Sequence, residues 1–125
     1  MIYVVDDNKV HADLAAKVIS KLNPGTEVKV FTDAFLALSN ALEEKPDLIV
    51  LDFMMPKLDG IELLRELRKE GIMSRAIIIS GLLKEVTRKL LPSNNVAGVL
   101  PKPFSPVALA KLVREALQEA PAQAS

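Results

Sequence analysis

The chain has 125 residues, of which half are apolar and 26% are charged, and this composition excludes an intrinsically disordered protein. Sixteen basic residues balance sixteen acidic ones, so bulk charge does not support binding to nucleic acid or to a membrane surface. Cysteine is absent, which excludes disulfides, thiolate metal sites and cysteine nucleophiles. We expect one soluble, cytoplasmic domain, because the apolar runs are too short to span a bilayer and Asp6 and Asp7 interrupt any signal peptide.

Five short runs of β-branched and other apolar residues predict strands. They span residues 2–5, 27–31, 48–51, 76–79 and, with a weaker signal, 97–100. Three of these runs are apolar throughout, a pattern typical of strands that helices cover on both faces. Longer segments of helical period separate the runs, so five strand–helix pairs follow one another along the chain. This alternation predicts a doubly wound α/β fold, with a five-stranded parallel sheet and helices on both faces.

The helical segments carry apolar stripes and terminal signals. The expected stripes are Val10, Leu14, Val18 and Leu22 in the first helix, Leu83, Val86 and Leu90 in the fourth, and Leu109, Leu112, Val113, Ala116 and Leu117 in the fifth. A capping box formed by Asp59 and Glu62 predicts the start of the third helix. Ser105 followed by Pro106 predicts the start of the fifth helix, and Pro92 predicts the end of the fourth.

Polar residues follow four of the predicted strands at the end where ligands bind in an open α/β sheet. Asp6 and Asp7 follow the first strand, and Asp52 follows the third. Ser80 follows the fourth strand and Lys102 the fifth. Because the carboxyl ends of parallel strands meet at one edge of the sheet, we expect these five side chains to converge there.

Three converging carboxylates need a cation or a proton to offset their repulsion. Oxygen ligands without His or Cys favour Mg²⁺. A carboxylate can also attack phosphorus and form an aspartyl phosphate, whose oxygens a lysine and a hydroxyl group can bind. Metal, nucleophile, hydroxyl and ammonium together indicate a site of phosphoryl transfer.

Four motifs along the chain resemble those of a known family. They are Val4-Val5-Asp6-Asp7, the segment 51–60 (Leu-Asp-Phe-Met-Met-Pro-Lys-Leu-Asp-Gly, which fits D-x-x-M-P-x-x-D-G), Ser80-Gly81, and Lys102-Pro103-Phe104. In this order and spacing they resemble the receiver domain of two-component response regulators, related to the single-domain chemotaxis regulator. The resemblance covers residues 2–118, and it implies a (βα)5 sheet with strand order 2-1-3-4-5.

The resemblance also implies a role for each matching residue. Asp52 would accept a phosphoryl group from a histidine kinase or a phosphotransfer protein. Mg²⁺ would be bound by Asp6, Asp7 and Asp52 and by the backbone carbonyl of Met54. Ser80 and Lys102 would contact the phosphoryl oxygens, and the Lys102-Pro103 bond would be cis. Such a domain is not an enzyme, apart from promoting its own phosphorylation and dephosphorylation.

Three positions depart from the pattern of similar domains. Val99 occupies the place of an aromatic switch residue three positions before Lys102, so we expect activation to reshape instead the loop around Gly81 and Leu82 and the face of the fourth and fifth helices. Met54 and Leu82 flank the acceptor and are apolar, so neither can orient an attacking water. We therefore expect a long-lived aspartyl phosphate.

Other readings of the same residues stay open at this point. A pseudo-receiver would use the same fold as a docking module without being phosphorylated. A haloacid-dehalogenase-type phosphatase would need a second acid two residues after its nucleophile, where this chain has Met54. Ser80 could simply bond to the backbone. His11, the one histidine, lacks spacing to partners that would make it a ligand or a phosphodonor, and we expect it to flank the site.

We expect a receiver domain over residues 1–119 and a flexible tail or the start of a linker over residues 120–125. The chain would signal through a downstream protein partner or through an output domain outside these residues. A homodimer is a further option. We expect neither nucleic acid nor membrane to bind this domain directly.

Overall fold

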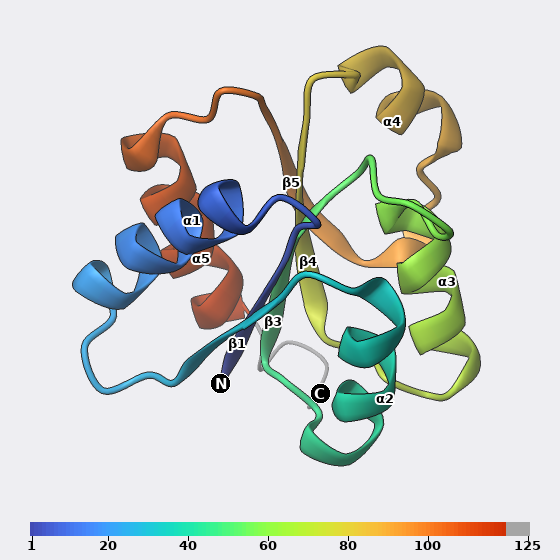
Figure 1. Ribbon diagram of the computed structural model, residues 1–125, viewed down its shortest axis with the longest axis horizontal. Coiled ribbons are helices and arrows are strands. Elements are labelled where there is room, and N and C mark those ends of the chain that lie inside the picture. Colours follow the sequence, from blue (N-terminus) through green and yellow to red (C-terminus); the bar gives the residue numbers. More distant parts are fainter. Residues whose placement is uncertain (120–125) are drawn as a thin grey trace.

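Strands and helices alternate along the chain in the computed structural model, which describes residues 1–119 (Figure 1). The elements are β1 (Ile2–Val5), α1 (Lys9–Leu22), β2 (Val28–Phe31), α2 (Ala34–Glu44), β3 (Leu48–Asp52), α3 (Gly60–Lys69), β4 (Arg75–Ser80), α4 (Leu83–Lys89), a 3-10 turn (Pro92–Asn94), β5 (Val96–Pro101) and α5 (Pro106–Glu119). All five predicted strands are present, each within one or two residues of its expected bounds. The expected tail at 120–125 lies outside the described residues.

The five strands form one parallel sheet in the order β2-β1-β3-β4-β5, which confirms the predicted topology. Helices α1 and α5 cover one face, and α2, α3 and α4 cover the other (Figure 1). Strands β1 and β3 lie at the centre and are buried along their whole length. The residues that follow them are therefore held between two packed layers. Among residues 1–119, no helix combines the length and the apolar character that crossing a membrane requires.

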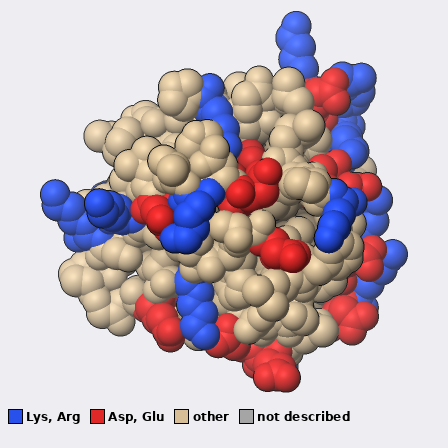
Figure 2. All heavy atoms as spheres, in the orientation of Figure 1, with Lys and Arg blue, Asp and Glu red and all other residues tan. Residues whose placement is uncertain are grey.

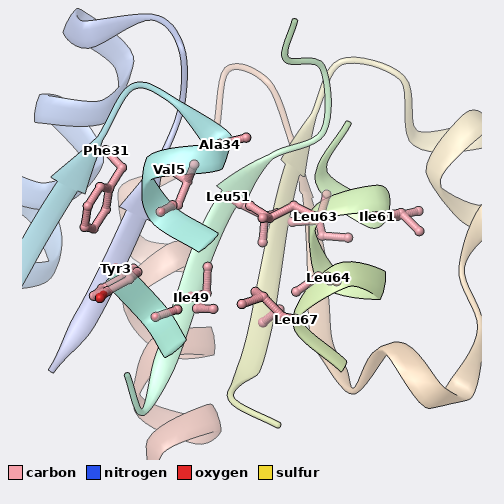
Figure 3. Close-up of a cluster of buried hydrophobic side chains, with 14 of the residues drawn as sticks. Tyr3, Val5, Phe31, Ala34, Ile49, Leu51, Ile61, Leu63, Leu64 and Leu67 are labelled. Atoms are coloured by element: carbon pink, nitrogen blue, oxygen red, sulfur yellow. The ribbon is translucent and has the colours of Figure 1, made fainter. Parts of the chain in front are cut away.

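Successive side chains of each central strand point to opposite faces of the sheet and pack into two separate cores. In β1, Tyr3 and Val5 point to the face of α2 and α3 (Figure 3), whereas Ile2 and Val4 point to the face of α1 and α5. This explains why the central strands are apolar throughout, since both of their faces are shielded from water. Both cores are dominated by Ile, Leu, Val and Ala, and burial of these side chains is the main favourable term in folding.

The buried face of α1 differs from the predicted stripe. Its buried residues are Ala12, Ala15 and Ile19, whereas Val10 and Leu14 are 74% and 52% exposed. A spacing of four residues drifts by about 40° per step on a helix of 3.6 residues per turn, so such a stripe winds away from the surface that it first faces. Two small alanines instead let the helix approach the sheet closely. The predicted stripe was therefore wrong at Val10, Leu14 and Leu22, which stay at the surface, whereas its fourth member, Val18, is half-buried against the core.

The predicted helix signals are confirmed at both α3 and α5. In α3, the Asp59 carboxylate accepts from the Glu62 amide at 2.7 Å, and the Glu62 carboxylate accepts from the Asp59 amide at 2.8 Å. In α5, the Ser105 hydroxyl accepts from the Ala108 amide at 3.2 Å. Helix α4 ends at Lys89, before Pro92 as predicted, and has only seven residues. Of its expected apolar stripe, Val86 is fully buried, whereas Leu83 is 41% exposed.

Candidate functional site

The three predicted aspartates meet at the carboxyl edge of the sheet. Asp6 follows β1, and Asp52 is the last residue of the neighbouring strand β3. One carboxylate oxygen from each of Asp6, Asp7 and Asp52 lies within 4.8 Å of the other two. Asp6 and Asp52 are buried, whereas Asp7 is exposed. The parallel register that pairs Val5 with Leu51 sets Asp6 and Asp52 at the same level of the sheet, which is why residues distant in sequence converge.

Lys102 brings a positive charge to this cluster. Its ammonium nitrogen lies 3.2 Å from Oδ2 of Asp6 and 3.3 Å from Oδ2 of Asp52. Lys102 follows β5, and its backbone amide donates to the carbonyl of Ser80 at 3.0 Å, which ties the loop to the end of β4. The Lys102-Pro103 peptide bond is cis, as the resemblance implied. The lysine thus reaches the two central carboxylates from the edge strand of the sheet.

Ser80 lies at the same edge of the sheet, but its side chain bonds to the backbone, which was the alternative to a role in phosphoryl binding. The residue is buried at the end of β4, and its hydroxyl oxygen accepts a hydrogen bond from the amide of Leu82 at 2.8 Å. In the described structure its oxygen therefore supports the loop that leads into α4. Contact with a phosphoryl group would require the Ser80 side chain to turn.

The loop between β3 and α3 is held close behind Asp52. The amide of Phe53 donates to the carbonyl of Ile79 at 3.1 Å, and the amide of Gly60 donates to the carbonyl of Phe53 at 2.8 Å. A Cβ atom on Gly60 would lie 2.8 Å from the carbonyl oxygen of Asp52, so no larger residue fits without moving the backbone of Asp52. Met54 follows in this loop, two residues after Asp52, and its side chain is 57% exposed.

The environment of Asp52 opposes its ionisation. Burial raises the pKa of the Asp52 carboxyl above its usual range, the negative charge of Asp6 adds to this effect, and Lys102 counteracts it. Three carboxylates face a single ammonium group here, so the site carries excess negative charge. The oxygen-only donor set fits a hard divalent cation such as Mg²⁺ in charge and in ligand type.

One residue at the site was not predicted to take part. The Nδ1 atom of His11 lies 3.1 Å from the ammonium nitrogen of Lys102. His11 lies in the first turn of α1, and this turn follows directly on the loop that contains Asp7. It also lines a cavity of about 400 Å³ with Lys102, Asp52 and the apolar side chains Leu14, Ile79 and Phe104. The sequence signal that could have placed His11 at the site is its position in the first helical turn after the acidic end of the first strand.

The surface around these elements carries mixed charge. Figure 2 shows acidic and basic side chains intermingled over the visible face, with no basic patch on it. This distribution agrees with the zero formal net charge of the chain. The excess negative charge of the site is therefore a local property, produced by the fold and not by the overall composition.

Replacement of Asp52 by Asn should stabilise the metal-free protein at neutral pH. Because the folded-state pKa of Asp52 is raised, its contribution to stability is present below the unfolded pKa and is lost as pH rises through the folded pKa. We expect Asp52→Asn to raise Tm by several degrees at pH 7 in EDTA, with a gain that shrinks toward acidic pH.

Added Mg²⁺ should then raise Tm more for the wild type than for Asp52→Asn, since the variant lacks one carboxylate ligand. The exposed Asp13, which pairs only with Lys9 on the surface of α1, provides the control Asp13→Asn. An equal Mg²⁺ effect on wild type and Asp52→Asn would contradict the metal assignment.

Comparisons with known proteins agree with this geometry. The family model described as the response regulator receiver domain matches residues 2–114. The alkaline phosphatase synthesis transcriptional regulatory protein PhoP of Bacillus subtilis is 37% identical over 105 residues, which are 84% of this chain and 43% of that protein. The regulatory protein VanRc of Enterococcus gallinarum is 31% identical over 94% of this chain and 49% of that protein. The chain thus spans less than half the length of these two relatives.

Solved structures show the same fold. The receiver domain of the Francisella response regulator 1452 has a TM-score of 0.81 and 32% identity, and covers 94% of this chain and 96% of that one. The receiver domain of NtrX from Brucella abortus has a TM-score of 0.82 and 29% identity, with 94% and 98% covered. By sequence and by fold, the chain belongs to the response regulator receiver domains, the phosphorylatable signalling switches of two-component systems.

Proposed function

We propose that this domain is switched by phosphorylation of Asp52, with the phosphoryl group supplied by a histidine kinase or a phosphotransfer protein. The observation that carries the proposal is the convergence of Asp6, Asp7 and Asp52 around the ammonium group of Lys102. The receiver domain proposed to hold this site spans residues 1–119. A location in the cytoplasm is part of the same proposal.

The acceptor carboxylate acts as the nucleophile. An oxygen of ionised Asp52 forms a bond to phosphorus while the bond between phosphorus and the donor's nitrogen breaks, and the leaving imidazole takes up a proton. Lys102 stands 3.3 Å from Asp52 and can donate to a phosphoryl oxygen once the carboxylate is esterified. Asp6, Asp7, Asp52 and the backbone carbonyl of Met54 would hold Mg²⁺, which when bound neutralises charge between the carboxylates and the phosphoryl oxygens.

Ser80 provides a route from the acceptor to α4. Its hydroxyl oxygen accepts from the amide of Leu82, the residue at the N-cap of α4, and within residues 1–119 no side chain caps the amides of that helix itself. We propose that the hydroxyl turns to donate to a phosphoryl oxygen. This movement would release the Leu82 amide and loosen the start of a helix of only seven residues.

A second contact joins α4 to the segment that follows the acceptor. Lys89, the last residue of α4, pairs with Asp59, the N-cap of α3. Its ammonium group also lies 5.6 Å from the ring centroid of Phe53, next to Asp52. Val99 packs against the core of that face but carries no ring that could change its orientation. We therefore propose that the readout passes through α4 and its flanking loops.

The partners are proposed from the surface and from the family. The exposed apolar stripe of α1, which includes Val10, Leu14 and Leu22, offers a surface beside the acceptor for a kinase or phosphotransfer protein. The longer relatives support an output domain outside these residues, and a separate downstream protein or a phosphorylation-dependent homodimer are the other outlets. A phosphorylation-independent docking module has no observation in its favour.

Incubation with acetyl phosphate and Mg²⁺ should add the mass of one phosphoryl group to the intact protein. The reason is that a small donor needs only the acceptor, the metal ligands and Lys102. Intact-mass measurement should show no addition for Asp52→Asn and none in the presence of a chelator. An equal mass gain in Asp52→Asn would place the acceptor elsewhere, and no gain in the wild type with either acetyl phosphate or a cognate kinase would favour the docking module.

The aspartyl phosphate should be long-lived, because Met54 and Leu82, which lie two residues after Asp52 and Ser80, have exposed apolar side chains that cannot orient water. Met54→Asn should shorten its lifetime on the order of tenfold, measured as loss of the phosphorylated mass after donor removal. Met73→Asn is the matched control, since Met73 is similarly exposed but precedes β4 at the opposite edge of the sheet. A half-life of seconds for the aspartyl phosphate of the wild type, in Mg²⁺ and without a phosphatase, would contradict the prediction.

Beryllofluoride, which mimics the phosphoryl group, should shift the amide NMR signals of residues 82–100. The physical reason is the pair of contacts that tie α4 to Ser80 and to the loop after Asp52. The same addition to Asp52→Asn should leave these signals in place. If the wild-type signals of residues 82–100 stayed unchanged, the α4 route would be wrong.

A further inference from the structure

His11 makes a contact that the proposed mechanism does not yet use. Its Nδ1 atom lies 3.1 Å from the ammonium nitrogen of Lys102, and the ring stands at the exposed mouth of the site. An ammonium group donates hydrogen bonds and cannot accept them, so Nδ1 must be the acceptor. The proton of the neutral imidazole then lies on Nε2, directed away from the lysine.

The ammonium group of Lys102 has three protons and three close partners, of which His11 and Asp6 are hydrogen-bond partners and Asp52 is an ion-pair partner. The distances from its nitrogen are 3.1 Å to Nδ1 of His11, 3.2 Å to Oδ2 of Asp6 and 3.3 Å to Oδ2 of Asp52. These partners come from three elements, namely α1, the end of β1 and the end of β3. A lysine side chain has four rotatable carbon bonds and holds one position only when several partners fix it.

Phosphorylation of Asp52 converts its carboxylate to an ester, which removes the negative charge paired with Lys102 and offers a phosphoryl oxygen to the ammonium group in its place. The contacts to Asp6 and His11 can persist through this exchange, because neither residue is esterified. We propose that His11 is a positioning residue for phosphoryl transfer, which holds the Lys102 ammonium beside the acceptor. The inference deepens the proposed function and rests on it. It assigns His11 no direct contact with the phosphoryl group and no role as a metal ligand or phosphodonor.

Two substitutions separate the hydrogen bond from the bulk of the ring. His11→Leu removes the acceptor and keeps a side chain of comparable length, whereas His11→Asn keeps an amide oxygen near the place of Nδ1. Both changes are at an exposed position on the first turn of α1, so both variants should fold, which thermal melting checks. The Asn8 side chain that caps this turn accepts from the backbone amide of residue 11, and that bond survives either change.

The first measurement is the rate at which an amine-reactive acetylating reagent labels Lys102, followed by peptide mass spectrometry. We expect His11→Leu to speed labelling of Lys102 about three- to tenfold, the range of one net hydrogen bond, relative to the exposed Lys17 as an internal reference. His11→Asn should label within about twofold of the wild type. Equal labelling of Lys102 in the wild type and His11→Leu would overturn the inference, whatever the phosphorylation results are.

The second measurement is the rate of phosphorylation by acetyl phosphate over a range of donor concentrations in saturating Mg²⁺. His11→Leu should lower the maximal rate about three- to tenfold with little change in the half-saturating donor concentration, and His11→Asn should restore it. An unchanged maximal rate in His11→Leu, or no rescue in His11→Asn, would overturn the positioning role. If the wild type itself gains no phosphoryl group from any donor, the proposed function has failed, and labelling alone decides whether His11 holds Lys102.

Discussion

Three carboxylates within 4.8 Å of one another repel strongly, and this repulsion governs the behaviour of the site. One ammonium group, that of Lys102, offsets part of it by contacting Asp6 and Asp52. The negative charge left over accounts for three properties together. It suits the site to a divalent cation, and it contributes to the raised pKa of Asp52. It also lowers the stability of the folded protein when all three carboxylates are ionised.

The sheet is what makes so unfavourable a cluster possible. Strands β1 and β3 are buried on both faces and paired in register, so the residues at their carboxyl ends have little freedom to move apart. The loop behind Asp52 is held as tightly, since Gly60 approaches the carbonyl of Asp52 too closely for any larger residue. The favourable free energy of burying two apolar cores therefore offsets the repulsion among the carboxylates at this edge.

The two helices on either side of this centre differ in how they are held, and α4 packs the more sparsely of the two. Helix α4 is short, lacks a side-chain N-cap, and is joined to the surroundings of Asp52 through Ser80 and Lys89. Helix α1 buries alanines against the sheet and leaves larger apolar side chains in water. A rigid site flanked by one weakly fixed helix and one exposed apolar helix face suits a domain whose chemical change must be sensed by other proteins.

The sequence by itself determined the alternation of strands and helices, the parallel sheet and the residues at its carboxyl edge, because period, capping signals and strand-end positions are local properties. The capping box at Asp59 and the identity of Asp6, Asp52 and Lys102 needed no coordinates. Which side of α1 is buried, whether Ser80 bonds to the loop, and that His11 meets Lys102 were decided only by the tertiary structure. Each of these depends on the rotation of a helix or side chain against a neighbour distant in sequence, and no local pattern encodes that rotation.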